Sequence, residues 1–338
     1  MKNKIIFFSI DRLGDYLIRS NVINKISEYY NYKEIICSDK NFKLINTQKH
    51  FDKINLFNTE KKLFNKIKYF GIFFFSRYEA AIVFDGKSIS NILLIFIRAK
   101  FKYTFIYKKK GLVNNFFFII KKIFLKICDV KFTILNSRDL IELGNTEHYP
   151  TKYKELKRYY SNINNRVYHL NDEKILNYNN ELRNYILIHL DEKFMDIKNI
   201  KDDLENSIEL LSQKTKKRVI ISSFNNNHDY YKDLKIPKIK FSNVDFKEIL
   251  DTNIIIIENI PLSNFYYFIK NSYINISCHS GFMIHTSLLL NKNCIDIMNK
   301  KDEKWLNTWT TITKNYNKLY KSNTHEIFNL ICNIINEK

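Results

Sequence analysis

The sequence predicts an α/β protein built from two doubly wound, Rossmann-like domains. Short apolar runs of strand length alternate along the chain with longer segments of helical periodicity. This alternation stops over the polar stretch 145–182 and then starts again. The 338 residues, 45% of them hydrophobic, are enough for two domains that each have a core of their own.

The first half is predicted to form a parallel sheet covered by helices on both faces. It opens with the apolar run "KIIFFSI", and the segment that follows has apolar residues at helical spacing. The predicted strands are 4–10, 33–38, 78–85 and 102–107, and the predicted helices are 15–30 and 88–100. Strands that alternate with helices in this way favour parallel pairing.

The second half repeats this pattern. Its predicted strands are 184–190, 217–223, 252–259, 273–278 and 294–298, and its predicted helices are 201–213, 261–271, 282–290 and 324–336. We therefore expect an N-terminal domain over 1–175 and a C-terminal domain over 176–323. The segment 324–338 is expected to be a final helix, for which packing back on the first half stays open.

The clearest candidate site is the stretch "ISCHSGFMIHT", in which a strand turns into a helix. A parallel sheet binds ligands at such turns, beyond the carboxyl ends of its strands. The backbone N–H groups of Ser280, Gly281, Phe282 and Met283 would be unpaired there and would attract a phosphate, with His279 as a further donor. Gly281 would let the phosphate approach the backbone closely.

The same stretch does not predict a metal centre. Cys278, His279 and His285 follow no common zinc spacing, and no carboxylate lies nearby in the sequence. Cys278 ends a predicted buried strand, which disfavours a role as nucleophile. For His285, a core position and a ligand-binding position stay open. We expect no metal and no cofactor.

Other candidate residues follow strand ends. In "SIDRLGDYL", Gly14 permits a tight turn, and Asp15 is either a helix cap or a base at the ligand-binding edge. Lys193 either neutralises a diphosphate or belongs to a solvated charge run. The expected lining of a nucleoside pocket comes from two further strand ends: Ser222, Ser223, Glu258 and Ile260.

The net charge of +20 is spread along the chain and indicates either an AT-rich genome or an anionic partner. Five cysteines without a CxxC pair favour reduced thiols in the cytoplasm. The first apolar run is too short for a secretory signal, and no run is long enough to span a membrane.

The stretch 107–132 combines lysine clusters with a run of phenylalanine and isoleucine. Two interpretations stay open: a helix lying on an anionic membrane surface, or the buried face of an ordinary domain helix.

Four motifs in this order resemble the family 9 glycosyltransferases, the heptosyltransferase-like enzymes of lipopolysaccharide synthesis. They are "DRLGDYLIRSNVINKI", "YEAAIVFDGKSISN", "YILIHLDEK" and "HSGFMIHTSLLLN". The resemblance covers most of the chain. Three features depart from the family pattern: His279 stands where the family usually has an Asp, His285 falls one residue later than the family histidine, and "NKN" replaces Gly-Lys-Pro.

The resemblance implies a GT-B fold, with two Rossmann-like domains that face across a cleft. It implies metal-independent, inverting transfer of a sugar from a nucleoside diphosphate sugar to a lipopolysaccharide or other envelope glycan acceptor. Asp15 would be the base, and Lys193 with the Ser280-Gly281 turn would hold the diphosphate. The acceptor side would include Arg12, Gly14, Asp85 and Lys87.

The expected partners are a nucleotide sugar, a lipid-linked or glycan acceptor and an anionic membrane surface. The expected location is the cytoplasm, on the inner face of the membrane. Two alternatives remain: an inactive GT-B protein that binds glycolipid, and a basic nucleic-acid-binding protein. The second has no recognisable nucleic-acid-binding motif, so we expect no nucleic acid partner.

Overall fold

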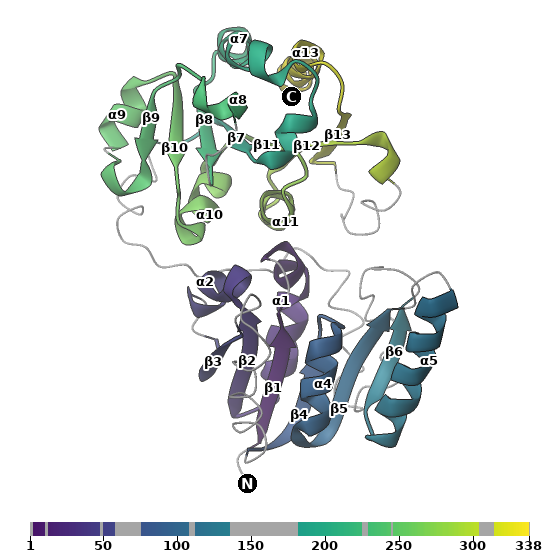
Figure 1. Ribbon diagram of the computed structural model, residues 1–338. Helices are drawn as coiled ribbons and strands as arrows, with labels where there is room; N and C mark the ends of the chain where they lie inside the picture. The colour runs from purple at the N-terminus through teal and green to yellow at the C-terminus, as the bar shows by residue number, and fades with distance from the viewer. Residues whose placement is uncertain are drawn as a thin grey trace. The chain divides into compact units, whose positions relative to one another are not determined.

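The computed structural model describes residues 3–10, 13–47, 50–57, 76–107, 112–135, 182–224, 229–244, 246–303 and 314–337. The chain divides into two compact units, 1–169 and 170–338 (Figure 1). The domain boundary expected near residue 175 lies outside the described residues.

The first unit contains a six-stranded sheet in the order β3-β2-β1-β4-β5-β6, in which every neighbouring pair is parallel. Its strands are β1 (Lys4–Ser9), β2 (Tyr32–Ser38), β3 (Lys53–Phe57), β4 (Arg77–Val83), β5 (Arg98–Tyr107) and β6 (Lys131–Leu135). Its helices are α1 (Leu13–Ser27), α2 (Asp39–Thr47), α4 (Ser88–Phe96) and α5 (Leu112–Ile127).

The second unit contains a seven-stranded parallel sheet in the order β13-β12-β11-β7-β8-β10-β9. Its strands are β7 (Ile186–Leu190), β8 (Val219–Ser223), β9 (Lys238–Lys240), β10 (Ile254–Glu258), β11 (Ile274–Ser277), β12 (Asn293–Met298) and β13 (Tyr316–Tyr320). Its α-helices are α7 (Ile200–Thr215), α8 (Asp229–Lys232), α9 (Phe246–Asp251), α10 (Leu262–Asn271), α11 (Gly281–Leu289) and α13 (Thr324–Asn336). The described residues of this unit also form three 3₁₀ turns: η4 (Glu192–Asp196), η5 (Phe241–Asn243) and η6 (Lys300–Asp302).

In the central strands of each sheet, the side chains that point to either face are buried. In β1, Ile6 and Phe8 join a cluster with residues of α4 and α5, while Ile5 and Phe7 are buried on the opposite face. Strands buried on both faces give continuous apolar runs such as "IIFF", and the sequence pattern arises from this burial. The predicted α/β, doubly wound fold class is confirmed.

The positions of most predicted elements agree with the structure, with one error. The helix expected over 88–100 ends at Phe96, and β5 begins at Arg98. The apolar run ends only at Ile97, and the mixed stretch "RAK" that follows it fits a helix as well as a strand, so periodicity alone could not show where the helix stopped. No helix in the described part of the chain is long and apolar enough to cross a membrane.

The final helix, α13, belongs to the second unit. Its buried side chains, among them Ile327, Phe328 and Ile331, lie in the same cluster as Leu204 and Ile208 of α7. The sequence left open a return to the first half, but this buried face packs within the second unit instead.

Each sheet has a point where the strand order reverses. In the first sheet it lies between β1 and β4, and in the second between β7 and β11. In open parallel sheets, the connections that follow the two strands at such a point run to opposite faces, and ligands bind beyond the carboxyl ends of those strands. The predicted sites at Asp15 and at Gly281 both follow strands that flank such a point.

Candidate functional site

The switch point of the second sheet brings together two of the predicted sequence motifs. β7 leads into η4, which carries Lys193, and β11 leads into α11, which begins at Gly281. Because β7 and β11 are paired neighbours, the two loops emerge side by side. The candidate site is built from these two loops.

A row of buried polar residues crosses the sheet directly beneath them. Cross-strand register aligns Ser222 of β8 with His189 of β7, His189 with Ser277 of β11, and Ser277 with Asp296 of β12. All four are buried, with at most 6% of their surface exposed. Residues aligned in this way lie on one face of a sheet. Two of them contact the turn before α11, because Ser277 accepts from the Ser280 amide and Asp296 contacts His279.

His279 connects this row to the loop. Its backbone is left-handed, with φ of 52°, which is an uncommon conformation for a residue other than glycine. Its Nδ1 lies 2.8 Å from Oδ2 of Asp296, which also accepts a hydrogen bond of 2.8 Å from the Tyr316 hydroxyl. The carboxylate therefore fixes the ring through Nδ1, and the His279 side chain stays 21% exposed.

The N-terminus of α11 presents unpaired backbone donors. Within the described residues, the amides of Gly281, Phe282 and Met283 have no hydrogen-bond acceptor. The Ser280 side chain makes no cap hydrogen bond. The expectation that the Ser280 amide is also free was wrong, because it donates to Ser277 Oγ at 3.3 Å. Three amides thus remain for an anion.

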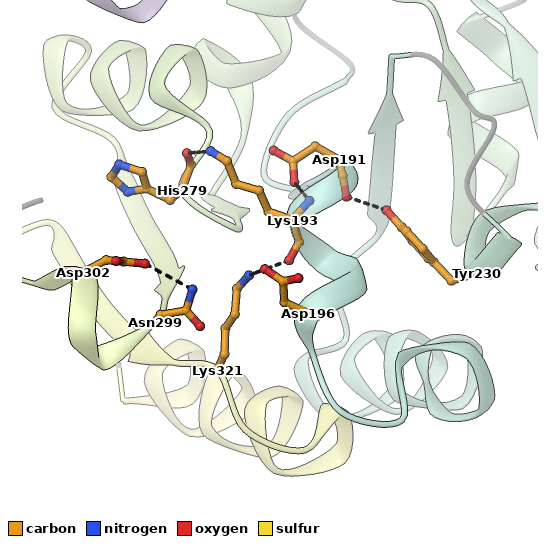
Figure 2. Close-up of polar contacts among 8 residues, drawn as sticks. All are labelled: Asp191, Lys193, Asp196, Tyr230, His279, Asn299, Asp302 and Lys321. Atoms are coloured by element: carbon orange, nitrogen blue, oxygen red, sulfur yellow. Dashed lines mark hydrogen bonds and ion pairs between the residues drawn. The ribbon is translucent and has the colours of Figure 1, made fainter.

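Lys193 places a positive charge beside these amides. Its Nζ donates to the His279 carbonyl at 2.5 Å, and Figure 2 shows its side chain extending from η4 to that carbonyl while the His279 ring points away. The turn is fixed by the Asp191 carboxylate, which accepts from the Lys193 amide at 3.0 Å. Lys321 donates to the Lys193 carbonyl at 2.6 Å and supports the loop from β13.

His189 is a buried part of the same region and belongs to the motif "YILIHLDEK", but the sequence assigned no role to it. Its Nδ1 lies 3.0 Å from Ser222 Oγ, and its ring packs 5.1 Å from each of Phe224 and Phe265. Burial lowers the pKa of His189 to about 4. The residue is therefore neutral at physiological pH and supports the site without adding charge.

The residues expected to line a nucleoside pocket lie at the ends of β8 and β10. Two of them face inward, contrary to expectation: Ser222 is fully buried with its hydroxyl against His189, and Ile260 is 1% exposed. Ser223 is also buried, whereas Glu258 is partly exposed and accepts from the Tyr231 hydroxyl at 2.7 Å. Of the four, Glu258 alone has a partly exposed side chain.

The switch point of the first sheet is organised by Asp85. This buried carboxylate accepts from the Ile10 amide at 3.0 Å, the Lys87 amide at 2.8 Å and the Ser90 hydroxyl at 2.7 Å. Burial raises its pKa, and these three donors oppose the rise. Both carboxylate oxygens accept hydrogen bonds from within the protein, so Asp85 holds the loops together. Contrary to our expectation, it is not exposed to an acceptor.

Asp15 and Lys87 flank this point. Asp15 lies in the first turn of α1 and is half-buried, and the helix N-terminus there favours a carboxylate. Burial lowers the pKa of Lys87, and the carboxylates of Asp85 and Asp15 oppose that effect. Lys87 Nζ donates to the Ile10 carbonyl at 2.5 Å. Gly14 begins this helix with Leu13, and Arg12 lies outside the described residues.

In the part of the chain that the structure describes, no three His, Cys, Asp or Glu side chains group closely enough to hold a metal ion. Cys278 is buried, as expected, and burial raises the pKa of its thiol well above the usual value. His285 is partly buried within α11.

Sequence reasoning missed Asp296, Tyr316 and Lys321. Asp296 had a signal, because it is the one charged residue in the strand "NCIDIM" and a buried charge needs a partner. Tyr316 and Lys321 belong to β13 and its end, which the sequence pattern did not predict. Tyr316 contacts Asp296, and Lys321 contacts Lys193, only because strands that are distant in the sequence lie close together in the sheet.

Two doubly wound parallel sheets, each with one point where the strand order reverses, are the architecture of the GT-B fold. Similarity to solved structures agrees with this assignment. The chain matches the E. coli ADP-heptose LPS heptosyltransferase II over 99% of both chains, with a TM-score of 0.63 at 12% identity.

Two further solved structures have the same architecture. E. coli heptosyltransferase WaaC with ADP-2-deoxy-2-fluoro heptose matches over 99% of both chains, with a TM-score of 0.59 at 10% identity. A putative UDP-N-acetylglucosamine 2-epimerase from Listeria monocytogenes matches over 99% of this chain and 88% of its own, with a TM-score of 0.58 at 8% identity.

No family model matches the sequence, and no curated protein matches it significantly. At identities of about a tenth, the structural matches establish the fold. The resemblance to family 9 glycosyltransferases inferred from the motifs is confirmed at that level: structural neighbours covering nearly the whole chain include heptosyltransferases and a glycosyl transferase family 9 protein from Veillonella parvula.

Proposed function

We propose that this protein is a glycosyltransferase that moves a sugar from a nucleoside diphosphate sugar to a lipopolysaccharide or other cell-envelope glycan. The observation that carries the proposal is the anion seat at the switch point of the second sheet. There, three unpaired amides of α11 lie beside the Lys193 ammonium. The fold shared with heptosyltransferases supports the same conclusion.

The seat suits the departing diphosphate. As the bond between the sugar and the phosphate breaks, negative charge grows on the phosphate oxygens. Fixed amide donors at a helix N-terminus and a lysine stabilise that charge without reorganisation, which lowers the barrier. We propose that Gly281, Phe282 and Met283 supply the amides and that Lys193 and His279 supply side-chain donors. These groups can perform the reaction without a metal ion.

The second half of the reaction requires a base for the acceptor hydroxyl. We propose Asp15, a half-buried carboxylate at the switch point of the first sheet, with Asp85 and Lys87 fixing the loops around it. Removing the hydroxyl proton as the oxygen attacks makes the acceptor a better nucleophile. Attack opposite to the leaving diphosphate would invert the anomeric carbon.

A second candidate is nucleotide-sugar epimerisation. Its support is the match to the putative UDP-N-acetylglucosamine 2-epimerase, whose TM-score is close to those of the heptosyltransferases. Both activities require a nucleotide sugar, so the anion seat fits either. They differ in whether an acceptor is consumed.

Calorimetry with ADP, GDP, UDP and CDP tests the seat. We expect at least one to bind the wild-type chain and Lys193→Ala to bind it at least about tenfold more weakly, because a hydrogen bond to a charged group contributes about 1.5–3 kcal/mol. Lys235→Ala, which removes an exposed lysine elsewhere in the second unit, is the matched control. If none of the four nucleotides binds, or Lys193→Ala binds like the control, the donor site is not at this seat.

A further inference from the structure

α5 presents an apolar surface to solvent instead of to the core. Seven of its large hydrophobic side chains are between 46% and 75% exposed: Phe116, Phe117, Ile119, Ile120, Ile123, Phe124 and Ile127. A helix on the surface of a globular domain normally buries such residues. The interpretation of this stretch as the buried face of an ordinary helix is therefore wrong.

These side chains form one continuous stripe, which we call the α5 stripe. At about 100° per residue, the seven positions span roughly 160° of the helix surface. The opposite side contains Leu125, which is 1% exposed, and Phe118, which is partly buried against the first unit's core. The helix is therefore anchored to its domain by a different face, and the stripe is not needed to hold it there.

Lysines border the stripe on both sides. By the same helical geometry, Lys121 lies along one border and Lys122 and Lys126 lie along the other. Lys121 also donates to the Gly86 carbonyl at 3.4 Å, which ties α5 to the start of α4. No acidic residue occurs in α5, and Lys108, Lys109 and Lys110 precede it in the sequence.

The neighbouring helix α4 contributes further exposed apolar side chains. Ile92 and Phe96, one helical turn apart, are 43% and 44% exposed. α4 and α5 pack on the same core cluster, so both cover one face of the first sheet. An apolar surface of this extent, bordered by positive charge, is characteristic of a binding surface.

We propose that the α5 stripe docks the protein on the surface of an anionic lipid bilayer. Apolar side chains would enter the boundary between headgroups and acyl chains, while the bordering lysines would contact anionic headgroups. The helix would lie in the plane of the membrane, because its 16 residues reach about 24 Å and a bilayer core is ~30 Å thick.

The charge pattern favours a bilayer over a second copy of the chain. If two α5 stripes packed face to face, the lysines that border one would meet those that border the other. Like charges at such an interface oppose association, whereas anionic headgroups neutralise every lysine. The inference rests on α5 itself and does not depend on the proposed transferase activity.

Co-sedimentation with vesicles tests the proposal. We expect the wild-type chain to bind vesicles of phosphatidylglycerol and phosphatidylcholine and to bind pure phosphatidylcholine far less. Lys122→Glu with Lys126→Glu should weaken binding at least about 25-fold, since each lysine near an anionic surface contributes roughly fivefold. Lys235→Glu with Lys270→Glu changes the net charge equally, from +20 to +16 because each substitution removes two units, and should bind like wild type.

A second pair of variants tests the apolar part. Ile123→Gln with Ile127→Gln should weaken vesicle binding about 10- to 30-fold, because each exposed isoleucine that enters the bilayer contributes roughly fivefold. Both side chains are solvent-exposed, so the melting temperature should not fall. Vesicle binding that neither pair of α5 substitutions weakens would overturn the proposal, and so would a control pair that weakens binding as much as the α5 pairs do. A dimer that forms without lipid and that the isoleucine substitutions dissociate would show that the stripe binds a second copy of the chain instead.

Discussion

Substitution of Gly281 separates ligand binding from stability more cleanly than any other change at the site. Gly281 is the first residue of α11, and its φ is not in the positive range that favours glycine. Alanine and valine can therefore adopt its backbone conformation. Each adds a side chain beside the unpaired amides of Gly281, Phe282 and Met283.

The two expected effects have opposite signs. Gly281→Ala should raise the stability of the helix by up to about 1 kcal/mol, or ~2 °C in melting temperature, because glycine is a poor helix former. Gly281→Val should leave stability nearly unchanged. Both should weaken nucleoside diphosphate binding, the valine by at least about 2 kcal/mol, or ~30-fold in Kd, because its branched side chain blocks hydrogen bonds to a charged group.

Isothermal titration calorimetry with the nucleoside diphosphate that the wild type binds gives the affinities, and scanning calorimetry gives the melting temperatures. A graded loss of affinity from Gly to Ala to Val, without a loss of stability, supports the seat. If Gly281→Val binds the nucleotide as well as the wild type does, the diphosphate does not approach the α11 amides.

Three further experiments test the proposed base, the buried histidine and the contact between His279 and Asp296. Asp15→Asn should fold and bind nucleotide normally but lower the transfer rate at least about 100-fold in a product assay, and a rate above about a tenth of wild type would assign the base elsewhere. The pKa of His189 lies below its unfolded value of 6.5, so its stabilising contribution is present above that pH and is lost as pH falls toward 4. Urea unfolding at pH 7 and pH 4 should therefore show roughly 3 kcal/mol more acid destabilisation in wild type than in His189→Gln, and equal losses would contradict the buried neutral state. Asp296→Asn and His279→Ala should each weaken nucleotide binding, and the double variant should lose no more than either, whereas additive losses in a double-mutant cycle would show that they act separately.

The sequence predicted the elements that are buried on both faces. β1 and β10 contain unbroken apolar runs, and β7 is apolar apart from His189, because each of these strands is covered on both sides. The edge strands β3 and β13, "KINLF" and "YNKLY", were missed because they are only partly buried and mix polar with apolar residues. Their pairing with interior strands, and not their own pattern, makes them strands.

The candidate site was predictable where its parts adjoin in the sequence. Gly281, which stands between two apolar runs, indicates the turn from β11 to α11, and the loop with Lys193 follows the end of a predicted strand. The contact between His279 and Asp296 depends on the pairing of β11 with β12, and the Lys193 contact depends on the pairing of β11 with β7. The order and register of the strands are properties of the folded sheet, so they cannot be predicted from the local sequence of any one strand.

The exposed apolar face of α5 had a sequence signal that periodicity could not resolve. A stripe of phenylalanine and isoleucine fits either the core or a bilayer, and the choice depends on which helix face packs on the sheet. In the structure, that face is the one with Leu125, so the stripe is left exposed.

The most direct test of the central claim is a transfer assay with mass-spectrometric detection. The protein is incubated with nucleoside diphosphate sugars and envelope glycolipid in excess chelator. The masses of the glycolipid and of the nucleotide are then measured. We predict a glycolipid heavier by one sugar, formed together with one equivalent of free nucleoside diphosphate, and we predict that Asp15→Asn forms neither. A nucleotide sugar converted to its epimer with the glycolipid unchanged, or no turnover of any donor, would contradict the central claim.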